Sequence, residues 1–146
     1  LYEAVLSEFS PLFRRAADPA ELVERPPEEV LPLLASGYLD TFDDPAVVRL
    51  LRISISEAAF DPETGNQFLE VAKTRVLKFL VAYLGRQVEL GRLKPHDPQS
   101  SARSFMGMLV IYVLNREVLT GLKKSLPDKE QYAKDVVGIF LDGLRA

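Results

Sequence analysis

The sequence contains no cysteine and only one histidine. Without cysteine, disulfide bonds, thiolate metal ligands and cysteine nucleophiles are excluded. His96 stands alone between Pro95 and Asp97 in an expected turn, so neither a Ser-His-Asp triad nor a two-histidine metal site has its components. We therefore expect no catalytic residue, no metal site and no cofactor, and we interpret His96 as a surface residue of a protein that is not an enzyme.

An excess of positive charge and a long hydrophobic run are also missing. The chain has 18 Lys and Arg against 21 Asp and Glu, whereas a nucleic-acid-binding module carries a basic stripe that neutralises phosphates. The longest uncharged run, residues 104–115, is far shorter than the roughly 20 apolar residues of a membrane-spanning helix. No signal-peptide pattern opens the chain. The sequence predicts a cytoplasmic protein that neither spans a membrane nor binds DNA by itself.

The composition that remains is that of a globular domain. Hydrophobic residues make up 47% of the 146 residues and charged residues 27%, a balance that differs from that of disordered chains. A chain of this length buries roughly 68–70% of its unfolded surface when it folds. We expect a single packed domain over residues 1–146.

Asp-Pro pairs mark the expected helix starts. In such a pair, Asp accepts a free amide as the N-cap, and Pro occupies the first helical position without losing a hydrogen bond. The pairs are Asp18-Pro19, Asp44-Pro45, Asp61-Pro62 and Asp97-Pro98. Asp128 can cap one more helix, and we expect Gly91 and Gly121 to close the helices before them.

These signals predict an all-α fold, a bundle of about six helices, since no segment shows the alternation of a strand. Pro11 and Pro32 fall inside expected helices, where a proline predicts a kink or a restart. The expected helices cover residues 1–17, about 28–42, 45–60, about 63–90, 98–120 and 129–145. The first has apolar residues at helical spacing from the start and no N-cap residue, so we expect the chain to begin inside a helix, with a trimmed terminus as the alternative.

The last two helices carry apolar residues on more than one side. Residues 105–114 leave no polar face, which is typical of a helix buried on all sides. This helix either occupies the centre of the core or meets the core on one side and a second subunit on another. Because Gly107, Gly138 and Gly143 permit close helix approach, we favour a homodimeric four-helix seam. The expected seam residues are Phe105, Leu109, Val113, Tyr132, Val136, Ile139, Phe140 and Gly143.

Three stretches carry a family resemblance. They are LYEAVL at 1–6, the segment from Leu50-Leu51-Arg52 to EAAFDPE at 57–63, and ELGRLKP at 89–95 continuing through Asp97-Pro98 to Ala102, Phe105, Gly107 and Met108. With the helix order, they resemble the C-terminal domain of the tetracycline-repressor (TetR) family. The resemblance implies that residues 1–6 begin the helix that follows the family's helix-turn-helix, and that the N-terminal DNA-binding domain is absent from this sequence.

The resemblance also implies a function. It predicts the effector-sensing and dimerisation domain of a one-component transcriptional regulator of repressor type. Its partners would be a second copy of the chain, a small and largely apolar effector, and operator DNA only through the missing domain. The alternative is a helical dimeric adaptor or scaffold that has no ligand pocket.

Side chains that could bind such a ligand are mostly aromatic, because an apolar cavity between helices suits large rings. The apolar candidates are Phe13, Tyr38, Tyr83, Met108 and Tyr112. Ser54 and Glu57 are the polar candidates, since they share one helix face with Leu50 and Glu57 lies near Phe60. Exposure to solvent or an internal ion pair is the alternative for polar residues in these helices.

Overall fold

The computed structural model describes residues 19–146, and the side chains of residues 20–63 and 76–146. This part of the chain is helical, and the predicted all-α fold is confirmed there. The expected helix at residues 1–17 and the prediction at Pro11 lie outside the described residues. The elements are α3 (Pro19–Glu24), α4 (Pro27–Thr41), α5 (Pro45–Phe60), α6 (Pro62–Glu89), α7 (Pro98–Glu117), the 3-10 helix η1 (Thr120–Ser125) and α8 (Lys129–Leu144).

Helix starts follow local chemistry. The Asp44 carboxylate accepts the Ala46 amide at 2.9 Å, and the Asp97 carboxylate accepts the Gln99 amide at 3.1 Å, so both predicted caps are confirmed. Asp128 precedes α8 as expected, but its side chain makes no capping hydrogen bond. The sequence therefore predicts a helix start well when the capping hydrogen bond joins residues only a few positions apart.

Gly91 ends α6 in the left-handed conformation, with φ of 75°. The Arg92 amide donates to the Gln87 carbonyl and the Gly91 amide to the Val88 carbonyl, which is the Schellman pattern. The similar prediction for Gly121 was wrong. Gly91 is the sole positive-φ residue in the described chain, α7 ends at Glu117, and Gly121 lies inside η1.

Pro32 does not restart α4, which runs without a break from Pro27 to Thr41. The proline removes one backbone donor, but its neighbours Leu31 and Leu34 are buried in the core on the same helix. Packing of this apolar face keeps the turn helical. Helix α3 begins at Pro19, where the Asp18-Pro19 pair predicts a helix start, but its extent was not predicted. The short helix η1 was not predicted at all, because six residues carry too little periodicity to detect.

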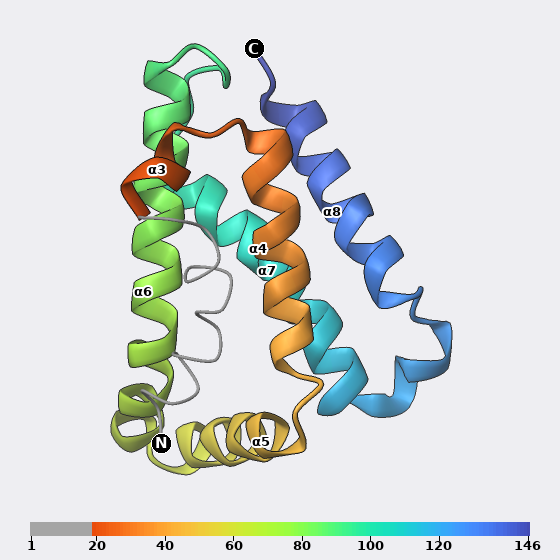
Figure 1. The fold of residues 1–146 in the computed structure, drawn as a ribbon. Helices are drawn as coiled ribbons and strands as arrows, with labels where there is room; N and C mark the ends of the chain where they lie inside the picture. The colour runs from red at the N-terminus through yellow and green to blue at the C-terminus, as the bar shows by residue number, and fades with distance from the viewer. Residues whose placement is uncertain (1–18) are drawn as a thin grey trace.

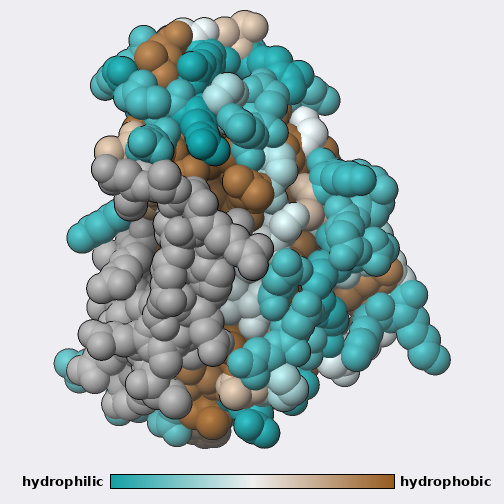
Figure 2. Space-filling model, in the orientation of Figure 1, coloured by the Kyte–Doolittle hydropathy of each residue, from teal (hydrophilic) through white to brown (hydrophobic). Residues whose placement is uncertain are grey.

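The helices form one bundle in which neighbours along the chain are not always neighbours in space (Figure 1). Helix α6 runs along one side and α8 along the other, with α4 between them and α7 crossing behind α4. Helix α5 lies across one end. Helix α3 lies beside α6 near the opposite end, where the C-terminus is also found. The hydrophilic surface in Figure 2 covers much of the α8 side, and apolar residues emerge at the end formed by α5.

The core lies between α4, α6, α7 and α8. Rings contribute much of it: Phe105 of α7 and Phe140 of α8 meet edge to face, with centroids 5.1 Å apart. The side chains without measurable exposure include Leu31, Leu39, Leu80, Tyr83, Leu84, Phe105 and Leu109. No helix in the described residues is long and apolar enough to span a membrane.

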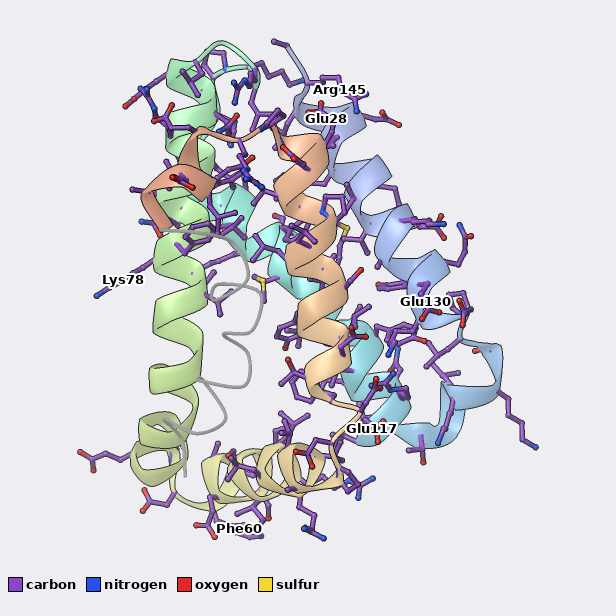
Figure 3. All side chains as sticks on the ribbon, in the orientation of Figure 1. Glu28, Phe60, Lys78, Glu117, Glu130 and Arg145 are labelled. Carbon is purple, nitrogen blue, oxygen red and sulfur yellow. The ribbon has the colours of Figure 1, made fainter. Side chains whose placement is uncertain are left out.

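The turn after α6 is tied to the end of the chain. Leu93 is buried beneath this turn, and it forms an isolated bridge with Arg145. The Lys94 amide donates to the Leu144 carbonyl at 2.9 Å, and Arg145 lies 3.4 Å from the Glu28 carboxylate at the start of α4 (Figure 3). These contacts hold α4, α8 and the α6–α7 turn together at one end of the bundle.

Two leucines of α4 test this description of the core. Leu31 is fully buried and Leu33 is 43% exposed. We expect Leu31→Ala to lower the free energy of unfolding by about 2–5 kcal/mol, because the deletion leaves a cavity. Leu33→Ala, the matched control, should change it by about 0.5 kcal/mol or less. Urea unfolding followed by circular dichroism measures both, and equal losses would contradict the assignment of the buried face.

Candidate functional site

Tyr83 of α6 is fully buried and connects two parts of the molecule. Its ring stacks on Phe79, one turn earlier, with centroids 6.0 Å apart. Its hydroxyl donates to the backbone carbonyl of Arg25 at 2.7 Å. Burial raises the pKa of the Tyr83 hydroxyl well above its ordinary value. The phenol is therefore a neutral donor that links the core to the residue after α3.

Met108 and Tyr112 lie close together on α7. The Tyr112 ring stacks on Tyr132 of α8, with centroids 4.6 Å apart, and the Tyr112 hydroxyl donates to the Pro127 carbonyl at 2.8 Å. The Tyr132 hydroxyl donates to the Met108 carbonyl at 2.5 Å. The two predicted ligand residues thus meet at the α7–α8 contact, where both tyrosine hydroxyls bind backbone carbonyls.

Tyr38 of α4 is half-buried against the core, and its ring meets Phe42 edge to face at 5.1 Å. Burial raises the pKa of the Tyr38 hydroxyl well above its ordinary value. Ser54 of α5 is buried, and its hydroxyl donates to the Leu50 carbonyl one turn earlier at 2.8 Å. Glu57, although it is on the same helix, is exposed to solvent. Phe13 lies outside the described residues.

An ion-pair network joins the far ends of α4, α7 and α8. Lys129 of α8 lies 2.7 Å from the Asp40 carboxylate and 2.5 Å from that of Asp43. Partial burial by itself would lower the pKa of Lys129, but the hydrogen bonds to both carboxylates and their charges raise it overall. Lys129 therefore stays charged and holds the start of α8 against the end of α4.

Arg116 extends this network from α7. Its guanidinium pairs with Glu117 at 2.9 Å and Asp43 at 3.7 Å, and it lies over the Tyr112 ring at 5.6 Å. The Arg52 side chain of α5 donates to the Glu117 carbonyl at 2.8 Å. Arg116 thus forms ion pairs with the neighbouring Glu117 and with Asp43 of the segment after α4.

The outer faces of α7 and α8 show where the expected seam residues lie. Ile139 is 66% exposed, Gly143 is exposed and Tyr132 is half-buried. The remaining expected seam residues are buried within their own subunit: Phe105, Leu109, Val113, Val136 and Phe140. On α7, Ile111 is 48% exposed and Gly107 is exposed.

Of the two alternatives left open for α7, a position at the centre of the core with burial on all sides does not describe the single subunit. One side of α7 packs into the core through Phe105 and Leu109, and another carries Ile111 and Gly107 to the surface. Hydrophobic periodicity could not separate these sides, because apolar residues occupy both of them. That this side meets a second subunit stays a prediction.

Sequence reasoning missed a cluster of hydrogen bonds around Gln87. This side chain is fully buried, and its amide nitrogen donates to the Val23 carbonyl at 2.8 Å. The Arg92 guanidinium donates to the neighbouring Glu24 carbonyl at 2.7 Å and to Gln87 Oε1 at 3.1 Å. The available signal was the position of Gln87, one turn after Tyr83 on the apolar face of α6.

The Glu24 side chain adds an ion pair to this cluster. The Arg86 guanidinium donates to both Glu24 oxygens, at 2.8 and 3.2 Å, and to Glu89 at 3.0 Å. The Arg86 hydrogen bond and the charges of Arg86 and Arg92 hold the pKa of Glu24 below its ordinary value. Among the side chains that the structure describes, those of residues 20–63 and 76–146, no group of three or more acidic or histidine residues is arranged to bind a metal ion. His96 is half-buried in its turn, with Nδ1 2.8 Å from the Lys94 carbonyl.

A comparison with protein families gives this geometry a context. Residues 29–143 match the family model described as AefR-like transcriptional repressor, C-terminal domain, one of the TetR C-terminal domain families. The chain belongs to the TetR family. The predicted family is thus confirmed over α4 to α8. Neither the curated proteins nor the solved structures that were compared gave a match.

Membership of the TetR family identifies the chain as the C-terminal domain of a transcriptional regulator. C-terminal domains of this family are regulatory rather than catalytic.

The Lys129 network yields a prediction about this TetR-family domain. Lys129→Met removes the contacts with Asp40 and Asp43 and should lower the free energy of unfolding by about 1 kcal/mol. Lys134→Met, on an exposed residue of the same helix, should lower it by about 0.5 kcal/mol or less. Chemical denaturation at low and high salt measures both, and the Lys129→Met loss should shrink as salt screens the charges. A loss in Lys134→Met as large as that in Lys129→Met would contradict the role of the network.

Proposed function

We propose that this chain is the effector-sensing and dimerisation domain of a TetR-family repressor. It pairs with a second copy through α7 and α8, and it binds a small, largely apolar effector inside the bundle. DNA is bound by a helix-turn-helix domain that belongs to the same regulator, and the protein acts in the cytoplasm. The observation that carries the proposal is that α7 and α8 each expose a large apolar residue together with a glycine one turn away, Ile111 with Gly107 and Ile139 with Gly143.

The glycines on this face are not explained by packing within the subunit. A Cβ atom added at Gly107, Gly138 or Gly143 would meet no atom within 4 Å. A glycine inside a helix costs about 1 kcal/mol relative to alanine. No contact within the subunit requires glycine at these positions. The missing side chain would instead allow a helix of a second copy to approach closely.

The exposed isoleucines lie one turn from two of these glycines. Ile111 follows Gly107 by four residues on α7, and Ile139 precedes Gly143 by four on α8, so each pair shares a helix face. Both isoleucines are exposed in the single subunit. Burial against a second copy would remove these side chains from water, which is favourable by roughly 25 cal/mol per Å² of apolar area.

The effector half of the proposal rests on the interior aromatic residues and on the family. Tyr38 and Met108 are packed at the edge of the core, and Tyr83 and Tyr112 lie within it. The hydroxyls of Tyr83 and Tyr112 already donate to backbone carbonyls. A ligand among these side chains would therefore meet mainly ring faces and the Met108 thioether, which suit an apolar compound.

The occupied hydroxyls also favour the second candidate function. In a helical adaptor, Tyr83, Tyr112 and Tyr132 would serve only to join helices through their backbone contacts. Such a protein would form the same dimer but would not respond to small molecules.

The dimer is tested by Ile139→Glu. We expect the unmodified chain to have twice the mass of one chain in light scattering at micromolar concentration. The variant should run as a monomer, because a buried and unpaired carboxylate opposes association. The control is Ile53→Glu on α5, which changes an isoleucine that is 55% exposed and should leave the dimer intact. A monomeric unmodified chain would disprove the seam.

Gly107→Leu separates the seam from folding of the subunit. A Cβ atom added at Gly107 meets no atom within 4 Å in its own subunit, Gly107 itself is exposed, and leucine is a better helix former than glycine. The thermal stability of the subunit should therefore be kept or increased while the dimer dissociates more readily. A variant that unfolds more readily and remains dimeric would contradict this role of Gly107.

Effector binding is tested by thermal shift with a panel of small apolar compounds. A compound at about 100 times its Kd stabilises the folded state by about 2.7 kcal/mol. We expect such a shift for at least one chemical class. It should be weakened in Tyr38→Ala, which removes a ring at the edge of the core, and retained in the surface control Ile53→Ala. If no compound shifts the melting temperature of the unmodified chain, the adaptor function is favoured instead.

A further inference from the structure

Helix α3 is too short to be stable by itself. It contains only six residues, and isolated helices shorter than about 12–15 residues are marginal in water even with favourable sequences. Leu22 anchors it in the core. Besides Leu22, other contacts with the rest of the bundle must hold α3 in place.

Three consecutive backbone carbonyls at the end of α3 accept hydrogen bonds from side chains. Gln87 donates to the Val23 carbonyl, Arg92 to that of Glu24 and Tyr83 to that of Arg25, at 2.8, 2.7 and 2.7 Å. Carbonyls in the last turn of a helix have no partner within that helix. The three side chains supply the missing donors, and we call this set of contacts the α3 latch.

The latch donors lie within one short stretch of chain. Tyr83 and Gln87 are one turn apart on α6, so they share a helix face. Arg92 follows the turn at Gly91 and also donates to Gln87 Oε1 at 3.1 Å. Because Gln87 is fully buried, loss of the latch would leave polar atoms without partners unless water entered. The latch is therefore either fully formed or opened as a unit.

Tyr83 gives the latch a connection to the interior. Its ring stacks on Phe79 in the bundle, while its hydroxyl holds the Arg25 carbonyl. Hydrogen bonds weaken steeply as they lengthen and bend, so a shift of the ring by about 1 Å would break a contact of this length. Any change of packing around Phe79 and Tyr83 is passed to the latch through one side chain.

We propose that the α3 latch is a conformational switch: α3 detaches from α6 as a unit while α4 to α8 stay folded, and packing around Tyr83 sets how often it detaches. In the proposed regulator, an effector would act on the segment before α4 in this way. Only this link between an effector and the latch rests on the proposed function. The switch itself can be tested without an effector and without dimerisation.

The first test is amide hydrogen exchange of the whole chain, followed by mass spectrometry. Tyr83→Phe keeps the ring and removes one latch donor, and Gln87→Leu removes another. We expect the peptide covering residues 19–25 to exchange about three- to tenfold faster in each variant, since one hydrogen bond contributes that much to an equilibrium. Peptides from α4 and α8 should change less than twofold.

Tyr112→Phe is the matched control, since it also removes one tyrosine hydroxyl from a backbone carbonyl, that of Pro127. It should leave exchange in residues 19–25 unchanged. In the unmodified chain, low urea should accelerate exchange in α8 more than in α3, because detaching α3 exposes little surface. Equal opening of α3 and α8 in all the variants, with the same dependence on urea, would overturn the switch.

The link to the interior is tested by Phe79→Leu, which removes the ring against Tyr83 without adding a polar group. Exchange in residues 19–25 should rise more than in Phe140→Leu, which disturbs the Phe105 contact elsewhere in the core. If both variants affect α3 equally, Tyr83 does not connect the interior to the latch. A chain that is monomeric and unresponsive to apolar compounds, yet releases α3 in these variants, would reject the proposed function and keep the switch.

Discussion

The arrangement of the domain depends on the requirement that a buried amide be fully hydrogen-bonded. Gln87 has no exposed surface, and its side chain contacts the Val23 carbonyl and the Arg92 guanidinium. Its backbone carbonyl also accepts the Arg92 amide in the turn at Gly91. An unsatisfied group at this depth would be costly, so these hydrogen bonds favour one relative position of α3, α6 and the start of the α6–α7 turn, the position in which the α3 latch is closed. The same turn carries Leu93 and Lys94 to the end of α8, which extends this order to the C-terminus.

The opposite end of the bundle is held by charge rather than by a buried amide. Ion pairs join α4, α7 and α8 here, from Lys129 and Arg116 to Asp40 and Asp43. Both carboxylates remain accessible to water. Such contacts position helices but contribute modestly to stability. Buried hydrogen bonds thus hold one end of the domain together, and ion pairs accessible to water hold the other end.

How much the sequence could predict follows the range of the interactions involved. The Asp44 and Asp97 caps and the turn at Gly91 involve residues at most a few positions apart, and all were predicted correctly. The helix end predicted at Gly121 was wrong, because glycine also fits within a 3-10 helix. The restart predicted at Pro32 was wrong, since α4 continues through this proline beside the buried Leu31 and Leu34. Family resemblance supplied the function, which composition and spacing could not.

The sequence by itself determined the all-α class and, to within a residue, the starts of the longer helices from α4 to α8, because these depend on local chemistry. It also indicated the family, through resemblance. Only the tertiary structure decided which side of α7 faces the core and which carries Ile111 to the surface, since apolar residues occur on both sides. It also brought Tyr83, Gln87 and Arg92 to carbonyls about sixty residues earlier in the chain. Contacts between residues so far apart in the chain leave no periodic pattern in the sequence, because they depend on how whole helices pack.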